Sequence, residues 1–563
     1  MSRKATPFHP AGAKRVALHF AVFVLVSFTQ HAAAQQPAFP DAYGAGAYVT
    51  GGRGGSVLHV TNLDDSGAGS FREALTSDES PRYIVFDVSG AIFLESPIGG
   101  VAGNFTVDGN SAPYGGITLR GHALRPTSTD NQIWKNIRFR NCSIGGFTGS
   151  LSNETCLATR NSIGVMVDHC SFAFARSKGF SNYSGSGVDD DGGNVTVQNS
   201  LFGESSQMAL IGGRDTSNNE FSFLRNMSSQ VGYRTPNLGG SNHADIINNY
   251  IYNWSGRLSS FYYRDFTTNM IGNNYVSGLN TDQNEAGSGN LHKIRSEDGM
   301  NPSLYLNDNF ISEERRPMSF PVQPETAFGL YSGSPADVIE ASWFVDQRLP
   351  LVGREIPLLQ ASEVKESLLP HVGASRYMAD DGTLQFYRDS IDEELVAIVE
   401  EDRVVAQIRS SEYPVLATDL PSETRPSGFY VSNPHIPEVW FAANVPAGED
   451  HNDISPNGYT WLEEYLNGGG QSHAADAGPA TDGGPGLDGG LGLDGGFDGG
   501  LGGGLDGGLS ADGGLPDGAV TGDGGPQSEV DEGCSCSLGS TDGPPAFGFL
   551  VAIGVAAFLR RRR

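Results

Sequence analysis

A short pattern of apolar and polar residues recurs seven times between Ile133 and Phe310, and this repetition strongly constrains the fold. Each copy is an alternating apolar segment, followed by a polar Asn or Asp and a second short apolar piece. Alternation with a period of two residues indicates β-strands, and a repeat of this length indicates stacked structural units. The seven copies are IRFRNCSI, VMVDHCSF, VTVQNSLF, FSFLRNMS, DIINNYIY, NMIGNNYV and LYLNDNFI.

Asparagine suits the corner of such a repeat, because it tolerates left-handed backbone and its amide can bond to the same residue one coil above and below. The chain is therefore predicted to be all-β and to fold as a right-handed parallel β-helix, with apolar residues inside and an asparagine ladder at one bend. Asn248 and Asn249 are predicted to be ladder residues. An antiparallel sandwich is the alternative, and it is disfavoured because tight Asn-Gly turns are scarce.

The two ends of the chain are predicted not to belong to this fold. Residues 1–34 combine basic residues, an apolar run and a small-residue site, which is the order of a secretory signal peptide. An uncleaved anchor is the alternative. Residues 469–533 are rich in Gly and Asp and cannot bury enough apolar surface to fold, so they are predicted to form a disordered spacer. A calcium-binding nonapeptide repeat is the alternative there.

The last segment, 534–563, contains GCSCS, the apolar run AFGFLVAIGVAAFL and a basic tail. This order resembles the tripartite C-terminal sorting signals of myxobacterial surface proteins. The resemblance implies processing at Cys534 or Cys536 and loss of the apolar tail, whereas a plain transmembrane anchor in the envelope is the alternative. Either reading predicts an exported protein that is tethered at the cell surface or outer membrane, or released outside the cell.

Charge and cysteine content limit the partners and the redox chemistry. The net charge of −29 includes about a dozen uncompensated carboxylates in the spacer, and such an acidic chain argues against nucleic acid as a partner. Three cysteines precede the tail, in a compartment where a disulfide can persist. They allow at most one bridge, and the sequence does not decide which pair forms it: Cys142, Cys156 or Cys170.

Several motifs in a fixed order resemble the pectate lyases of the parallel β-helix kind. The stretch TGGRGGSVLHVTNLDDSGAGSFREAL, followed by PRYIVFDVSGAI, is similar to their N-terminal coil and cap. DHCSFAF, LIGG, RTPNLGG and NNYIYNWSGR follow in the family's order, and RDSIDEELVAIV and GYTWLEEYLNG resemble its closing segments. The resemblance implies a β-helix over residues 35–312, and a segment over 313–468 that completes and covers the C-terminal coils.

The resemblance also implies a reaction, which is β-elimination on a polyuronate such as pectate. Neutralising the sugar carboxylate acidifies the proton on C5, and family members do this with calcium held by Asp and Glu, helped by Lys and Arg. An arginine takes the C5 proton, and the bond from C4 to the glycosidic oxygen breaks. Arginine is a poor base at its usual pKa, so neighbouring cations and a dry cleft are needed to favour its neutral form.

Five residues of this sequence are candidates for contacts with the substrate at the family's site. Arg234 in RTPNLGG matches the catalytic arginine, and Arg257 in NWSGR matches an arginine that could bind a substrate carboxylate. Gln207 falls near the basic position before LIGG. Lys178 in ARSKG stands where the family has calcium-binding acids, and Arg214 is a further cation for the substrate. A buried ion pair is the structural alternative for Arg234 and for Arg257.

Calcium, the cofactor that the resemblance implies, has only approximate ligands in this sequence. Glu154 roughly matches the acidic residue one coil before DHC, and Asp189, Asp190 and Asp191 follow on a nearby loop that could instead be solvated. Three hypotheses therefore remain, namely a lyase, a non-catalytic binder of acidic polysaccharide, and a structural surface protein. The retained arginine motif favours the first two, with polygalacturonate or a related polymer as partner of a monomer.

Overall fold

The structure is a computed structural model that describes residues of one compact unit, Met1–Asp482. The predicted signal peptide, spacer and C-terminal anchor lie outside the described residues, so these assignments stay predictions. No helix in the described part of the chain is long and apolar enough to cross a membrane. The described residues are Met1, 35–142, 155–184, 193–213, 219–240, 242–262, 264–281, 291–312, 328–331, 334–403, 405–406 and 420–468.

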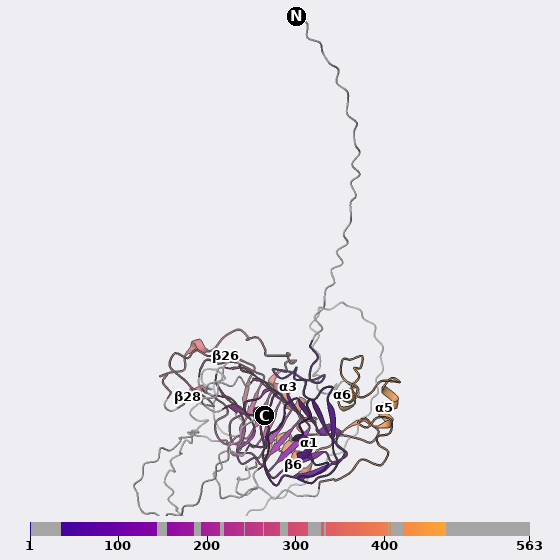
Figure 1. Ribbon diagram of the computed structural model, residues 1–563. Helices are drawn as coiled ribbons and strands as arrows, with labels where there is room; N and C mark the ends of the chain where they lie inside the picture. The colour runs from indigo at the N-terminus through magenta and orange to yellow at the C-terminus, as the bar shows by residue number, and fades with distance from the viewer. Residues whose placement is uncertain are drawn as a thin grey trace, which may run out of the picture. The chain divides into compact units, whose positions relative to one another are not determined.

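The chain winds through three sheets in turn and places one strand in each sheet per coil (Figure 1). We call them the first, second and third sheet, in the order in which the chain meets them from β2 onward. The second and third sheets contain nine strands each, so the described residues form nine coils. Strand β1 adds a tenth strand to the first sheet at its N-terminal edge.

The strands have the following bounds. The first sheet contains β1 (Ser56–Val60), β2 (Arg82–Phe86), β5 (Phe105–Asp108), β8 (Gln132–Lys135), β11 (Ile163–Asp168), β14 (Gly193–Gln198), β17 (Asn219–Leu224), β20 (Asn242–Ile247), β23 (Thr267–Ile271) and β26 (Ser303–Asn307). The second contains β3 (Gly90–Phe93), β6 (Ile117–Arg120), β9 (Ile137–Arg140), β12 (Ser171–Ala173), β15 (Leu201–Gly203), β18 (Met227–Ser229), β21 (Tyr250–Tyr252), β24 (Asn274–Val276) and β27 (Phe310–Ser312). The third contains β4 (Ile98–Gly99), β7 (Leu124–Arg125), β10 (Leu157–Ala158), β13 (Lys178–Ser184), β16 (Gln207–Gly213), β19 (Asn237–Gly239), β22 (Ser260–Tyr262), β25 (His292–Arg295) and β28 (Phe328–Leu330).

Strands that neighbour each other in these three sheets pair in parallel. The predicted parallel β-helix is therefore confirmed, and the antiparallel sandwich is excluded. The only antiparallel sheet among the described residues is the pair β29 (Arg376–Met378) and β30 (Leu384–Phe386), which lies outside the coils. Right-handed winding stays a prediction, and it follows the strong preference of parallel crossovers for that hand.

The core of the coils is a column of aromatic and aliphatic side chains that the strict register places above one another. Phe139, Phe172 and Phe202 pair in register on the second sheet, and their rings stack at centroid distances of 4.8 Å. All three side chains are buried. Burying a phenylalanine contributes about 1.5–3 kcal/mol, so repetition of the same contact along the axis is a main source of stability.

An asparagine ladder runs along the bend between the first and second sheets. The Oδ1 atom of Asn249 accepts a hydrogen bond from the backbone N–H of Asn226 at 2.9 Å, and Asn273 accepts from Asn249 at 3.0 Å in the same way. Asn309 continues the ladder by accepting from Asn273 at 3.1 Å. Asn248, one residue before, has a φ of +55°, as a corner requires. The prediction is confirmed for Asn249, whereas Asn248 forms the corner and its side-chain amide exchanges hydrogen bonds with the backbone of Leu359 at 2.8 and 3.0 Å instead of forming a rung.

The cysteine pairing, which the sequence left open, is a bridge between Cys142 and Cys156. Cys142 follows β9, and Cys156 directly precedes β10. The bridge therefore joins two residues of one coil that are 14 positions apart in the sequence. Cys170 is the remaining thiol, and it is buried in the core. Burial raises the pKa of this thiol well above its usual value, so it stays protonated and unreactive.

Two helices of the C-terminal segment cover the second sheet. Helix α3 (Ala361–Leu368) and helix α4 (Ser390–Glu400) bury apolar faces against side chains such as Met227 and Tyr250. Asp389 caps α4 by accepting from the backbone of Asp392, and both carboxylates pair with buried Arg140 on β9, at 3.2 and 2.6 Å. The motif RDSIDEELVAIV thus forms a helix that is tied to the middle coils.

The rest of the C-terminal segment returns to the N-terminal coils. The segment was predicted to cover the C-terminal coils, and it covers N-terminal coils as well. Helices α5 (Glu438–Asn444) and α6 (Trp461–Leu466), on the right in Figure 1, share an apolar cluster with side chains of β1 and β2, and the short helix α1 (Phe71–Leu75) follows β1 in the chain. Arg53 pairs with Glu463 at 2.8 Å, and the apolar side of α6 packs on the first strands of the first sheet. Two short 3-10 turns complete the described elements: Gly109–Ser111 and Ala341–Trp343.

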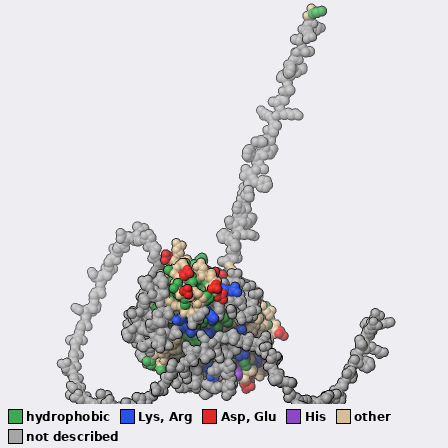
Figure 2. Space-filling model, turned by 90° about the vertical axis from the view of Figure 1, so that its left-hand side faces the viewer, with side chains coloured by type: hydrophobic (Ala, Val, Ile, Leu, Met, Phe, Trp, Pro, Cys, Tyr) green, Lys and Arg blue, Asp and Glu red, His purple; other side chains and the backbone are tan. Residues whose placement is uncertain are grey.

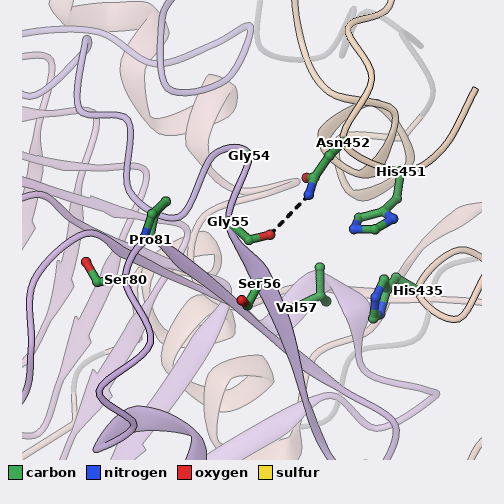
Figure 3. Close-up of a pocket in the computed structure, with 9 residues that line it drawn as sticks. All are labelled: Gly54, Gly55, Ser56, Val57, Ser80, Pro81, His435, His451 and Asn452. Carbon is green, nitrogen blue, oxygen red and sulfur yellow. Dashed lines mark hydrogen bonds between the residues drawn. The ribbon is translucent and has the colours of Figure 1, made fainter.

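A cluster of three histidines holds this returning segment against the first coil. His59 contacts Asp87 through Nδ1 at 2.9 Å and His435 through Nε2 at 2.8 Å. His451 lies edge-on to His435, with ring centroids 4.5 Å apart. Figure 3 shows His435 and His451 on the wall of an open pocket beside β1. Burial, followed by the nearby His451 and His59, lowers the pKa of His435 from 6.5 to about 4.

This cluster predicts that the fold loses stability in acid. The pKa of His435 is lower in the folded than in the unfolded chain, so its contribution is present above pH 6.5 and is lost as the pH falls toward about 4. Denaturant unfolding of the wild type and of His435→Gln across this pH range measures the effect. The variant should lose less stability than the wild type, and His122→Gln is the control outside the cluster. Equal pH dependence of wild type and His435→Gln would contradict this role.

Candidate active site

The bend at which the chain enters the third sheet carries the four predicted site residues that the structure describes. Lys178 and Gln207 are the first residues of β13 and β16 and lie opposite each other in register. Tyr233 bridges to Gln207 on the next coil, and Arg234 follows it. Arg257 stands three residues before β22, one coil further on. We call these five residues the basic corner. Figure 2 looks onto the side on which Figure 1 draws β28 and shows several exposed Lys and Arg side chains there.

Backbone contacts with both neighbouring coils fix Arg234 in place. Its carbonyl accepts from the N–H of Ala209 at 3.0 Å, and the N–H of Thr235 donates to Leu258 at 2.9 Å. Its φ of +64° is shared by corner residues on many coils, so this conformation does not distinguish Arg234. The register of the coils therefore fixes the backbone position from which the side chain of Arg234 extends.

The side chain of Arg234 is half-buried and has no ion-pair partner among the described residues. Its Nε is buried and has no hydrogen-bond partner in the part of the chain that the structure describes, and the guanidinium carbon lies 5.4 Å from the centroid of the Tyr233 ring. The alternative, in which Arg234 pairs with a carboxylate of a coil, is therefore not found in the described part of the chain. A guanidinium without a carboxylate partner is suited to an anionic ligand.

Arg257 is held in a fixed orientation by aromatic rings and hydroxyl groups. Its guanidinium lies 5.1 Å from the ring centroid of Tyr233 and 4.9 Å from that of Tyr331. Its Nε donates to the hydroxyl of Ser260 at 2.9 Å, and a terminal nitrogen donates to that of Tyr262 at 3.4 Å. Burial lowers the pKa of Arg257, but the phenol groups of Tyr262 and Tyr331 outweigh burial and raise it. This residue stays a cation.

Lys178 and Gln207 extend the corner toward the N-terminal coils. The ammonium of Lys178 donates to the hydroxyl of Ser177 at 3.1 Å. The amide nitrogen of Gln207 donates to the hydroxyl of Tyr233 at 2.9 Å, while its Oε1 is buried without a hydrogen-bond partner in the described chain. Side-chain contacts therefore link Gln207 to Arg234 and Arg257 through Tyr233.

Three tyrosines and one asparagine of this region escaped the sequence interpretation, which followed charged residues. Tyr233 lies between the two arginines, and the hydroxyls of Tyr262 and Tyr331 are 2.8 Å apart. Asn237 donates to the hydroxyl of Tyr262 at 3.2 Å. Alternation in the strand SFY could have indicated Tyr262, because Phe261 is buried in the core and its neighbours point to the other side.

Calcium does not fit the residues that the structure describes at this corner. Glu154, Asp189, Asp190 and Asp191 lie outside the described residues, as does Arg214, so their predicted roles stay untested. Within the described ranges no group of three or more Asp, Glu, His or Cys side chains is arranged to hold a metal ion. An ammonium at Lys178 repels a cation, and we derive no chemical step through calcium.

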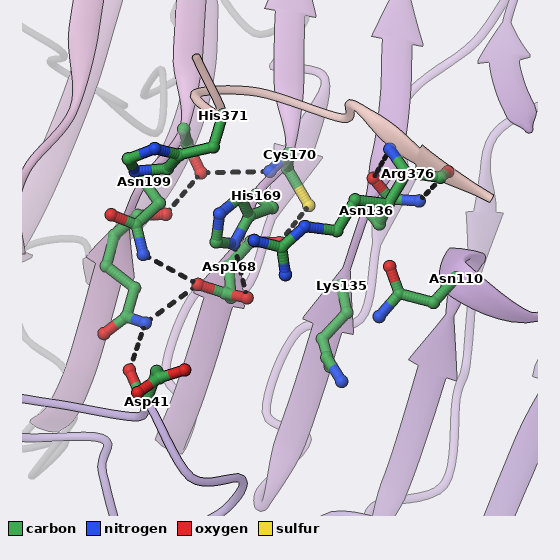
Figure 4. A network of polar contacts seen from close by, with 12 residues as sticks. Asp41, Asn110, Lys135, Asn136, Asp168, His169, Cys170, Asn199, His371 and Arg376 are labelled. Atoms are coloured by element: carbon green, nitrogen blue, oxygen red, sulfur yellow. Dashed lines mark hydrogen bonds and ion pairs between the residues drawn. The ribbon is translucent and has the colours of Figure 1, made fainter. Parts of the chain in front are cut away.

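Asp168, the last residue of β11, and His169 directly after it belong to a structural network away from the basic corner (Figure 4). The carboxylate of Asp168 accepts from His169 Nδ1 and from the amide of Gln198, both at 2.8 Å. Burial raises the pKa of Asp168, but the contact with His169 and the hydrogen bonds outweigh burial and lower it. Because Gln198 lies on the next coil, this carboxylate bridges two coils.

The chain is homologous to curated fungal proteins that are named probable pectate lyase C. The protein of that name from Aspergillus oryzae is 29% identical over 439 residues, which cover 76% of this chain and 93% of that protein. The one from Aspergillus fumigatus is 34% identical over 260 residues, or 46% and 58% of the two chains. Jun a 1, the major allergen from cedar pollen, is a solved structure with 16% identity and a TM-score of 0.43, covering 59% of this chain and 92% of its own. No family model matches the chain.

Proposed function

We propose that this protein cleaves pectate or a related polyuronate by β-elimination. The observation that carries the proposal is Arg234, a half-buried guanidinium without a carboxylate partner among the described residues, beside the second fixed guanidinium of Arg257. Homology to proteins named pectate lyase supports the same reaction. An uncharged or acidic corner would offer no attraction to a polyanionic chain.

Elimination requires positive charge at the sugar carboxylate and a base at C5. Arg257 and Lys178 supply positive charge. Arg234 and Arg257 both lie against the ring of Tyr233, whose hydroxyl accepts from Gln207, the residue opposite Lys178 in register. In the reaction Arg234, as the base, takes the proton from C5, and the electron pair of the C5–H bond forms the C4=C5 double bond. The bond from C4 to the glycosidic oxygen breaks, and that oxygen takes a proton from water. Arg234 is the catalytic residue that the family resemblance assigns.

Substitution of Arg234 tests the lyase proposal. Arg234→Lys should lower kcat on polygalacturonate by roughly 100- to 10,000-fold, because a point ammonium does not reproduce the planar guanidinium at the reacting sugar. The unsaturated product is followed by its ultraviolet absorbance. Arg264→Lys is a matched control, since Arg264 is exposed and shares the positive φ of Arg234. Full activity of Arg234→Lys would refute the assignment.

Binding without cleavage is the second candidate function, and Lys178 favours it. An ammonium in place of calcium-binding acids supplies one charge, whereas calcium supplies two and can bind two carboxylate oxygens. A corner built on Lys178 can therefore bind a uronate well and activate it weakly. Compared with a calcium site, this corner lacks both the negative charge of the acids and the positive charge of the ion, so its net charge is similar.

The role of Lys178 is tested by titration with oligogalacturonate, first in chelator and then in millimolar calcium. Binding should depend little on calcium, weaken as salt rises because exposed charges are screened, and weaken in Lys178→Ala. Arg120→Ala, in the second sheet, is the control for loss of a cation elsewhere. Tight binding that needs calcium and ignores the lysine would mean that carboxylates such as Asp189 to Asp191 form a calcium site.

We also propose that the protein is exported and tethered to the cell envelope, as the sequences of its two ends indicate. The mature chain should begin near Gln35, and it should be attached through the region from Cys534 to Cys536. Intact-mass measurement of the native protein checks both ends together. A soluble form that ends at an unmodified Arg563 would refute the anchor.

A further inference from the structure

Three tyrosine rings form a cluster at the bend between the first and second sheets. Tyr114 precedes β6, Tyr377 is the middle residue of β29, and Tyr387 directly follows β30. The ring centroid of Tyr114 lies 5.3 Å from that of Tyr377 and 5.0 Å from that of Tyr387, and both contacts are edge-on. Tyr114 is 42% exposed, and the other two are half-buried. We call these three residues the tyrosine platform, because together they present aromatic surface to solvent.

The pairing of β29 with β30 fixes two rings of the platform. Tyr377 stands opposite Gln385 in the antiparallel register, and Tyr387 lies two residues beyond Gln385, so these three side chains share one face. Met378 belongs to the opposite face and is buried. Its backbone N–H donates to the carbonyl of Ala112 at 3.0 Å, which ties the strand pair to the turn that precedes β6.

A buried cation holds the ring of Tyr387 in place. The guanidinium carbon of Arg138, on β9, lies 5.4 Å from the centroid of this ring. Arg138 is fixed in turn, because its Nε donates to the hydroxyl of Thr118 at 3.0 Å and lies 3.6 Å from a carboxylate oxygen of Asp389. A surface that is rigid before binding loses little conformational entropy when a ligand binds. The platform is therefore preorganised.

The hydroxyl groups of the platform are available to a ligand. None of the three has a hydrogen-bond partner in the part of the chain that the structure describes. Burial raises the pKa of Tyr377, and the nearby Tyr114, Glu423 and Asp381 raise it further. This phenol therefore stays protonated at neutral pH and can both donate and accept a hydrogen bond.

Two exposed carboxylates, those of Asp381 and Glu423, lie near the platform. The segment of Glu423 is held beside the start of β3, because its carbonyl accepts from the N–H of Ser89 at 2.9 Å. Arg376 precedes Tyr377 in β29, but it extends from the other face of the strand, into the network of Figure 4. The platform therefore offers no attraction to a polyanion, in contrast to the basic corner.

A pyranose chain without carboxylates matches this combination of groups. Its sugar rings present apolar C–H groups on their faces, and these pack on aromatic rings. Hydroxyl groups around the edges of the sugars can bond to phenol oxygens and donate to carboxylates. A polyuronate has similar faces, but it adds a negative charge to each sugar, which the two carboxylates repel.

We propose that the tyrosine platform is a second binding surface, which takes an uncharged pyranose chain by stacking it on Tyr114. This surface lies on a different bend of the coils from the basic corner, which begins at β13, where the chain enters the third sheet. Binding at the platform does not depend on the proposed lyase function. One molecule can therefore hold a neutral polysaccharide at the platform and a polyuronate at the basic corner.

Calorimetric titration of the purified protein with cellohexaose tests this proposal, because cellohexaose is uncharged and its sugars present C–H groups on both faces. Tyr114→Ala should weaken binding by roughly tenfold or more, as truncation of a central aromatic residue does at other interfaces. Tyr114→Phe keeps the ring and should lose less affinity. Phe310→Ala, which removes a ring that is 51% exposed on β27, is the matched control and should bind as the wild type does.

The same titration separates the platform from the basic corner and from other occupants. Arg234→Lys should bind cellohexaose as the wild type does, and hexagalacturonate should not displace cellohexaose. A wild type that binds cellohexaose but forms no unsaturated product supports the platform and contradicts the lyase proposal alone. Absence of binding at millimolar cellohexaose, or equal binding by Tyr114→Ala, overturns the platform. A dimer in sedimentation that Tyr114→Ala dissociates would assign this surface to a second copy of the chain and overturn the proposal as well.

Discussion

The fold and the site both depend on the register between successive coils, which the asparagine ladder fixes. Each ladder amide accepts from the backbone of the coil before it, and its nitrogen donates to the backbone or the next amide, as Asn249 does with Phe223 and Asn273. A slip of one residue would break every rung and turn the buried phenylalanines outward. The ladder therefore makes the stack cooperative, because no coil can shift without unpairing two buried amides.

A fixed register also explains how cations can gather at one corner. Neighbouring coils are about 4.8 Å apart, so Lys178, Arg234 and Arg257, which come from three of four successive coils, form a row of like charges at a spacing set by the backbone. Tyrosine rings lie between and beside the guanidinium groups and contribute cation–π attraction. The repulsion that remains between these cations favours the binding of an anion at the corner. A polyuronate carries carboxylates at regular intervals along its own axis. The like charges at this corner thus oppose the stability of the fold and favour the binding of an anion.

The sequence predicted the bend between the first and second sheets better than it predicted the site. The repeated motif spans the strand, the left-handed corner and the ladder residue, so Asn249 could be assigned to the ladder from local pattern alone. The basic corner lies where coils differ in length, and contacts such as that between Tyr262 and Tyr331 join residues that are 69 positions apart. Motifs identified Arg234 and Arg257, but only the register shows that Tyr233 lies between them. The roles of these residues stay predictions.

Mass spectrometry of the oligosaccharides released from polygalacturonate tests the central claim most directly. The claim is that the basic corner removes the C5 proton and expels the glycosidic oxygen. It predicts products whose non-reducing ends carry a C4=C5 double bond, each lighter by one water than the corresponding product of hydrolysis. Saturated products from the purified protein, or the absence of any shortened chains, would contradict it.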